Sequence, residues 1–162
     1  MLDTTDTPPI RGTILNEPFH RDLYSINSDE IVAAFIQTLL CGRFTSRTRL
    51  SDSDVVGIVR SFTAHHPLEY LDSFPGAFES GIRRRRLIVT ETGHLGAAPA
   101  GTQLSDLVCI LFGCKVTVVL RLLPDESKLW FIGECYVHGF MDGEAMAGLE
   151  TGSFTARDFA LK

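Results

Sequence analysis

The chain has 162 residues, of which 44% are hydrophobic and 22% are charged, so its composition is that of a folded globular domain and excludes wholesale disorder. Its 20 acidic and 15 basic residues give a net charge of −5, which disfavours binding to nucleic acid. The first residues form neither a basic start nor an apolar run, and no stretch is apolar enough to cross a membrane. These features predict one cytoplasmic domain, residues 1–162, without a membrane or nucleic-acid partner.

The N-terminal half shows the periodicity of helices. Residues 1–20 contain three prolines and no periodic pattern, which predicts an extended arm. Apolar residues then recur at helical spacing over 31–40 and over 55–62, with helix-ending signals at Gly42 and Pro67. The segment Leu68–Phe74 predicts a third, shorter helix. We therefore expect a helical part over residues 28–80.

The periodicity changes from helical to strand-like near Arg85. Short β-rich runs alternate with turn signals, and the predicted strands are Arg86–Thr90, Asp106–Phe112, Val116–Leu123 and Leu129–His138. This predicts a β part over residues 85–138, followed by a short helix and a closing strand or tail over 139–162. The expected fold class is α+β, with N-terminal helices packed on a small bent antiparallel sheet or partial β-barrel.

Four motifs in the C-terminal half carry a family resemblance. They are RRRLIVTETGHLG at 84–96, DLVCILFG at 106–113, VVLR at 118–121 and FIGECYVHGFMDGE at 131–144. In these motifs the chain resembles the region downstream of the HET domain in fungal heterokaryon-incompatibility proteins. Family members usually have Gly-Asp where this chain has Ser105-Asp106, a change that concerns a turn rather than the fold. Nothing resembles the HET domain itself, and the resemblance implies no assigned chemistry for the region.

The predicted strand Leu129–His138 is the main candidate for a functional site. Strict alternation would direct Leu129, Phe131, Cys135 and Val137 to the core, and Trp130, Ile132, Glu134, Tyr136 and His138 to the other face. We interpret Glu134, Tyr136 and His138 as candidate catalytic residues, and Trp130, Ile132 and Asp142 as candidate substrate-binding residues. In the alternative interpretation, Glu134 and Tyr136 satisfy backbone groups at a bend and His138 caps the next turn.

Arg121 is the fourth candidate catalytic residue. It could hold a substrate carboxylate through two parallel hydrogen bonds, or it could pair with Glu134 across the sheet as a structural ion pair. The arginine run 83–86 alternates between two strand faces, which is typical of a solvated strand entry. The four cysteines lack the spacing of metal ligands and no phosphate-binding loop is present, so we predict reduced thiols, no metal and no cofactor.

Two functions of different classes are compatible with these residues, and we take the first as our prediction and the second as its alternative. One is a small cofactor-independent cyclase or isomerase of fungal specialised metabolism, such as a Diels–Alderase-type pericyclase, whose pocket binds an apolar small-molecule substrate. The other is a non-catalytic interaction or regulatory module related to HET incompatibility proteins. A second copy of the chain, in a homodimer, is the expected protein partner. A closed apolar cavity lined by Trp130, Tyr136 and His138 would favour the enzyme, and a flat exposed apolar patch would favour the module.

Overall fold

A computed structural model describes residues 9–15, 28–42, 50–64, 81–123 and 128–162 of the chain. Within these ranges the helices are α1 (Ser28–Leu39), α2 (Asp52–Thr63) and α5 (Glu144–Thr151). The strands are β1 (Ile10–Ile14), β2 (Arg85–Val89), β3 (Leu95–Pro99), β4 (Leu107–Leu111), β5 (Thr117–Leu122), β6 (Leu129–Val137) and β7 (Arg157–Phe159). The predicted helix Leu68–Phe74 lies outside the described residues.

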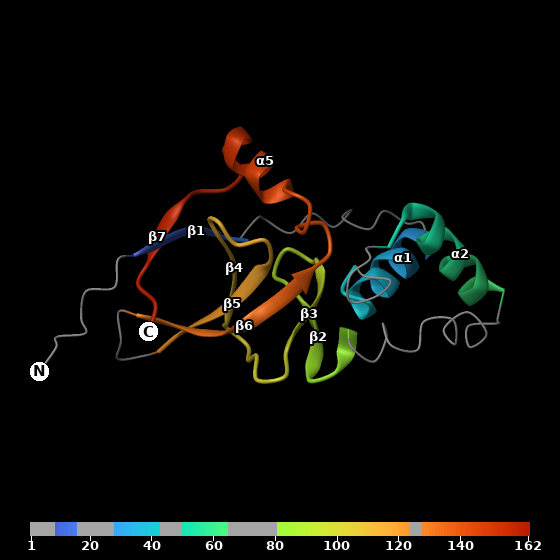
Figure 1. Cartoon of the computed structure of the whole chain (residues 1–162), viewed down its shortest axis with the longest axis horizontal. Helices are drawn as coiled ribbons and strands as arrows, with labels where there is room; N and C mark the ends of the chain where they lie inside the picture. The colour runs from blue at the N-terminus through green and yellow to red at the C-terminus, as the bar shows by residue number, and fades with distance from the viewer. Residues whose placement is uncertain (1–8, 16–27, 43–49, 65–80, 124–127) are drawn as a thin grey trace, which may run out of the picture.

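The described strands form one antiparallel sheet in the order β2-β3-β6-β5-β4-β1-β7 (Figure 1). The sheet curves until the residues after β7 reach the start of β6, where Leu129 N donates to Ala160 O at 2.8 Å and Lys162 N donates to Leu129 O at 3.0 Å. This contact is a single bridge between Leu129 and Leu161 rather than a ladder of paired residues, so the sheet stays open. The α+β fold class predicted from the sequence is confirmed.

Each face of the sheet carries its own hydrophobic cluster. One face packs beneath α5 and includes Val119, Val137, Phe140 and Phe154. The other face includes Val118 and Leu120 of β5 together with residues of β4 and β7. Neighbouring residues of a strand point to opposite faces, so the buried residues 117–120 of β5 supply side chains to both clusters. The sheet is therefore the central layer of the β part.

The helices α1 and α2 form a third cluster of their own, with Ile36, Val55 and Ile58 at its centre. At the start of α2, Ser51 N donates to Asp54 Oδ2 at 2.9 Å and Asp54 N donates to Ser51 Oγ at 3.2 Å. This reciprocal capping box explains why the second helix begins where its sequence pattern predicts. The helix pair approaches the sheet through α1 and β3 (Figure 1).

A glycine after α1 lets the helical part approach the sheet closely. Gly42 has φ +66, a left-handed conformation that side chains disfavour. A Cβ atom at Gly42 would lie 3.0 Å from Cε2 of Tyr136, whose ring is buried. Tyr136, which the sequence placed on the solvent side of its strand, therefore forms part of the junction between the helices and the sheet.

Three details of the β part differ from the sequence predictions. Residues 10–14, inside the predicted arm, form β1 between β4 and β7. Strand β3 was not predicted at all. The predicted alternation along β6 is wrong because the pairing with β5 shifts between Val119, which faces Gly133, and Leu120, which faces Phe131. This bulge leaves Phe131 50% exposed, whereas Cys135, Tyr136 and Val137 are all buried.

Candidate functional site

The residues proposed from the sequence as one pocket wall are distributed over several surroundings. Glu134 is exposed, and its backbone oxygen accepts a hydrogen bond from Arg85 Nη1 at 3.0 Å. Trp130 is 42% exposed, with the Lys162 ammonium 5.7 Å from its ring centroid. Ile132 is half-buried and packs against the cluster beneath α5. None of these side chains, nor His138, lines the groove described below.

Arg121 is held by a carboxylate different from the one predicted. Its Nε and Nη2 atoms donate to Oδ1 and Oδ2 of Asp106, both at 2.7 Å, and Nη2 also donates to Gly101 O at 2.8 Å. Burial raises the pKa of the Asp106 carboxyl, but the hydrogen bonds from Arg121 and from Gln103 N outweigh that effect and the pKa is lowered. The predicted pair with Glu134 is thus replaced by a two-pronged pair with Asp106, which anchors the loop between β3 and β4.

Tyr136 and His138 meet a third residue that the sequence did not single out. Tyr136 Oη lies 3.4 Å from His138 Nδ1, and His94 Nδ1 lies 3.1 Å from the backbone oxygen of His138. The His94 ring packs edge-on against Phe140 with centroids 4.5 Å apart. Burial lowers the pKa of His138, nearby His94 lowers it further, and Glu144 acts in the opposite direction. This cluster ties β3 to the turn that follows β6.

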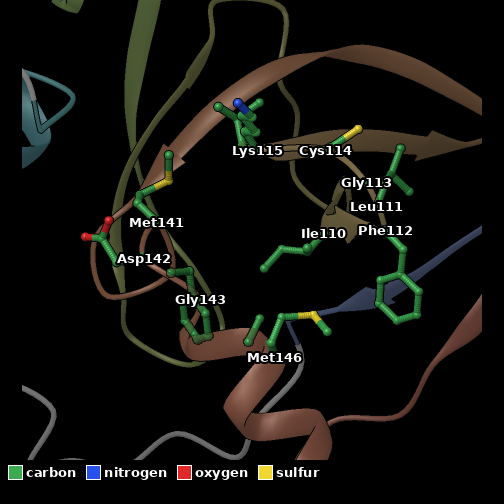
Figure 2. A pocket seen from close by; sticks show the side chains of 13 residues that line it. Ile110, Leu111, Phe112, Gly113, Cys114, Lys115, Met141, Asp142, Gly143 and Met146 are labelled. Carbon is green, nitrogen blue, oxygen red and sulfur yellow. The ribbon is translucent and has the colours of Figure 1, made fainter.

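A groove of about 580 Å³ lies between the turn joining β4 to β5 and the N-terminal end of α5. We call it the β4–α5 groove. Figure 2 shows the residues around Phe112 and Cys114 on one wall and those around Asp142 and Met146 on the other. Its lining is Ile110, Leu111, Phe112, Gly113, Cys114, Lys115, Val116, Phe140, Met141, Asp142, Gly143, Ala145 and Met146. The groove is therefore assembled from two segments distant in sequence.

The groove has an apolar floor and a few polar groups at its rim. Phe112 is 37% exposed and Met146 is 50% exposed, so the apolar lining is accessible to solvent. Lys115 stands on the wall formed by the β4–β5 turn, and Asp142 on the wall next to α5. Glu144, also exposed, accepts a hydrogen bond from Asp142 N at 2.8 Å. Among the site residues proposed from the sequence, Asp142 is the one that lines this groove.

Metal sites, reactive cysteines and membrane-spanning helices are the other features to consider among the described residues. No group of three or more His, Cys, Asp or Glu side chains there could hold a metal ion. Burial raises the pKa of the Cys109 thiol to about 12 and that of Cys135 to about 11, so neither is an activated nucleophile. No helix among the described residues is long and apolar enough to cross a membrane.

Comparison with known proteins identifies the family. A family model described as the Het-6 beta-barrel domain matches residues 61–156, a range that contains β2 to β6 and α5 and thus both walls of the groove. No curated protein and no solved structure matches the chain. The match agrees with the resemblance to HET-related proteins in the sequence motifs. Because it spans more than half of the chain, the chain belongs to the Het-6 beta-barrel domain family.

Proposed function

We propose that this protein is a non-catalytic interaction module that binds an apolar segment of a protein partner in the β4–α5 groove. The observation that carries the proposal is the groove itself, an accessible apolar surface built between the β4–β5 turn and α5. Met141 and Met146 both line it. Unbranched methionine side chains adjust to ligands of different shape, which is why they are common on peptide-binding surfaces.

The rim charges indicate what kind of segment fits. Asp142 places an exposed carboxylate at the α5 wall, and the exposed Glu144, which does not line the groove itself, accepts a hydrogen bond from Asp142 N beside it. A segment with an apolar anchor residue and a neighbouring lysine or arginine would bury the anchor and pair its charge with these groups. Lys115, on the opposite wall, would accept an acidic residue farther along the same segment. We therefore assign the groove to an amphipathic peptide segment.

The cyclase or isomerase hypothesis leads to the same groove. Its volume lies within the range of small-molecule sites, roughly 300 to 1,000 Å³, and Asp142 offers a carboxylate at its wall. However, Glu134, Tyr136, His138 and Arg121 do not line it. Arg121 is already bonded to Asp106, and Tyr136 is buried at the helix junction. A catalytic role for these four residues would need a different site, so the interaction module is the better-supported proposal.

A peptide selection tests the proposed function. A random peptide library would be selected on the wild-type protein, and enriched peptides would be measured for binding to Met146→Glu and Leu122→Glu. Both positions are exposed apolar residues, but only Met146 lines the groove. We expect enriched peptides to combine an apolar anchor with a basic neighbour, and their affinity to fall about tenfold or more in Met146→Glu but not in Leu122→Glu.

The outcomes separate the two functions. Peptides that bind both variants as well as the wild type would show that the groove is not their site. Failure to select any peptide, together with saturable binding of a small apolar compound that Met146→Glu abolishes, would replace the interaction module with a small-molecule site. Thermal melting of each variant would establish that any loss of binding occurs in a folded protein.

A further inference from the structure

The loop between β3 and β4, residues 100–106, presents an unusually exposed leucine. The side chain of Leu104 is 98% exposed, the highest value among the described large hydrophobic residues. A single exposed leucine on a mobile loop would need no explanation. This loop, which we call the Leu104 loop, is instead bonded to the sheet on both sides of its tip.

Arginines from two strands hold the Leu104 loop in place. Arg86 Nη1 of β2 donates to Thr102 O at 2.8 Å, and Arg121 Nη2 of β5 donates to Gly101 O at 2.8 Å. After the tip, Asp106 binds Arg121 with both carboxylate oxygens and accepts from Gln103 N at 2.7 Å. A side chain offered on such a fixed loop loses little backbone entropy when it binds, as an interface anchor requires.

The surroundings of the loop are basic. Arg84 and Arg86 are exposed, and Ala100 N at the start of the loop donates to Arg84 O at 3.0 Å. The surroundings of the β4–α5 groove are acidic along α5, where Asp142 and Glu144 are exposed. The same chain thus carries a protruding apolar residue with basic neighbours and an apolar groove with acidic neighbours.

The two surfaces cannot meet within one molecule. The Leu104 loop precedes β4 and the β4–β5 turn follows it, so they lie at opposite ends of this strand (Figure 1). Strand β4 has five residues, which at about 3.4 Å per residue keeps the ends about 17 Å apart. A contact between the two surfaces must therefore join different molecules.

We propose that Leu104 of one copy of this chain binds in the β4–α5 groove of a second copy, with Arg84 and Arg86 facing the second copy's Asp142 and Glu144. The inference rests on the proposed function, because it names an occupant for the same groove. In this head-to-tail arrangement, the molecule that gives its loop keeps a free groove, and the molecule that gives its groove keeps a free loop. Repetition produces chains or rings larger than a dimer, and with one anchor residue per contact the association is weak and depends on concentration.

Sedimentation velocity over a range of protein concentrations tests this arrangement. We expect wild-type protein to grow beyond a dimer as its concentration rises, and to return towards monomer in high salt, which screens the rim charges. Leu104→Asp removes the anchor and Met146→Glu blocks the groove, so each variant alone is expected to stay monomeric. Leu122→Glu, an exposed apolar residue outside both surfaces, should associate like the wild type.

Mixing the two monomeric variants gives the sharper result. The Leu104→Asp protein still offers a groove and the Met146→Glu protein still offers a loop, so an equimolar mixture is expected to form a dimer and nothing larger. A mixture that stays monomeric, a wild type that stays monomeric, or a wild type that stops at a dimer would overturn the proposal. Peptides selected on the groove would still bind in each of these cases, so the proposed function fails or survives separately.

Discussion

Three residues that carry a side chain, Cys41, Arg84 and Ser105, adopt positive φ values in the described part of the chain. At φ 72, Ser105 occupies a conformation that glycine adopts without steric cost. The resemblance described in the sequence analysis implies a glycine at this position in HET-related proteins. The substitution keeps the turn and leaves a local conformational cost in it.

That cost predicts the effect of restoring the glycine. We expect Ser105→Gly to raise the free energy of unfolding by about 0.5 to 1 kcal/mol, because relief of the left-handed conformation outweighs the added freedom of the unfolded chain. Ser105→Ala keeps the side-chain cost and should change stability by less than about 0.5 kcal/mol. Urea unfolding of the three proteins measures both values. Equal stabilities for the glycine and alanine variants would contradict this account of the turn.

His138 gives the protein a pH dependence whose sign follows from its surroundings. Burial and His94 hold its pKa below the unfolded value of about 6.5. The unfolded chain therefore binds the proton more readily, and stability should fall as the pH drops through about 6.5 towards the folded pKa. We expect His138→Gln to flatten this part of a melting-temperature profile against pH.

Glu144 supplies the control for that prediction. It raises the pKa of His138, so Glu144→Gln should lower that pKa further and make the loss of stability on acidification larger. A His138→Gln profile that superimposes on the wild type would show that other groups cause the pH dependence. If neither substitution changes the profile of melting temperature against pH, then protonation of His138 does not affect the stability of the fold.

At the scale of elements, the sequence patterns predicted those helices and strands in which buried residues recur at a regular spacing. The helices α1 and α2 and most of the strands from β2 onward lie close to their predicted ranges. Strand β3 was missed because its sequence, Leu-Gly-Ala-Ala-Pro, lacks the β-branched and aromatic residues that usually mark a strand. Its small residues instead fit the crowded position between β2 and β6, where Ala97 and Ala98 are almost fully buried.

The candidate site was harder to predict than the elements. The bulge at Ile132 changes which side chains of β6 face the core, and such a shift depends on the pairing with β5 rather than on one strand's sequence. The β4–α5 groove forms where segments far apart in the chain come together. The residue pattern within one segment cannot predict such a contact. Asp142 was included because it follows β6 closely, whereas Met146 and Phe112 carried no signal beyond their apolarity.

The helix α5 contains a glycine that its packing requires. A Cβ atom at Gly148 would lie 2.3 Å from Cδ2 of Phe154, a buried ring in the cluster beneath the helix. We expect Gly148→Ala to destabilise the protein by about 1 to 3 kcal/mol, because the ring has no room to move. Alanine contributes roughly 1 kcal/mol of helix propensity, so this net loss requires the overlap with the ring to cost about 2 kcal/mol or more.

A neighbouring position separates packing from propensity. Ala147 is exposed on the same helix, so Ala147→Gly should cost only about 1 kcal/mol through propensity. Chemical denaturation of both variants tests the comparison. A Gly148→Ala protein more stable than the wild type would mean that α5 is packed less closely against Phe154 than described.

For the molecule as a whole, the reactivity of the cysteine thiols measures how well both faces of the sheet are protected from solvent. Cys114 is exposed on the turn at the groove, whereas Cys109 and Cys135 are buried in the two faces of the sheet. We expect a thiol-specific reagent to modify Cys114 at once, and Cys109 and Cys135 only when the sheet unfolds. Cys114→Ser should remove the fast phase. Rapid modification of Cys109 or Cys135 in the native protein would contradict the described core.

The position of β1 determines when the sheet can be completed during synthesis. Gly12 pairs with Leu111 on one side and with Arg157 on the other, so both partners of this strand lie far from it in sequence. Contacts so distant in sequence slow folding, because a long loop must close before they form. Until these pairs form, β4 has an unpaired edge. Another unfolded chain can pair incorrectly with that edge. Pairing of β1 with β4 and β7 is therefore expected to be a late step in folding.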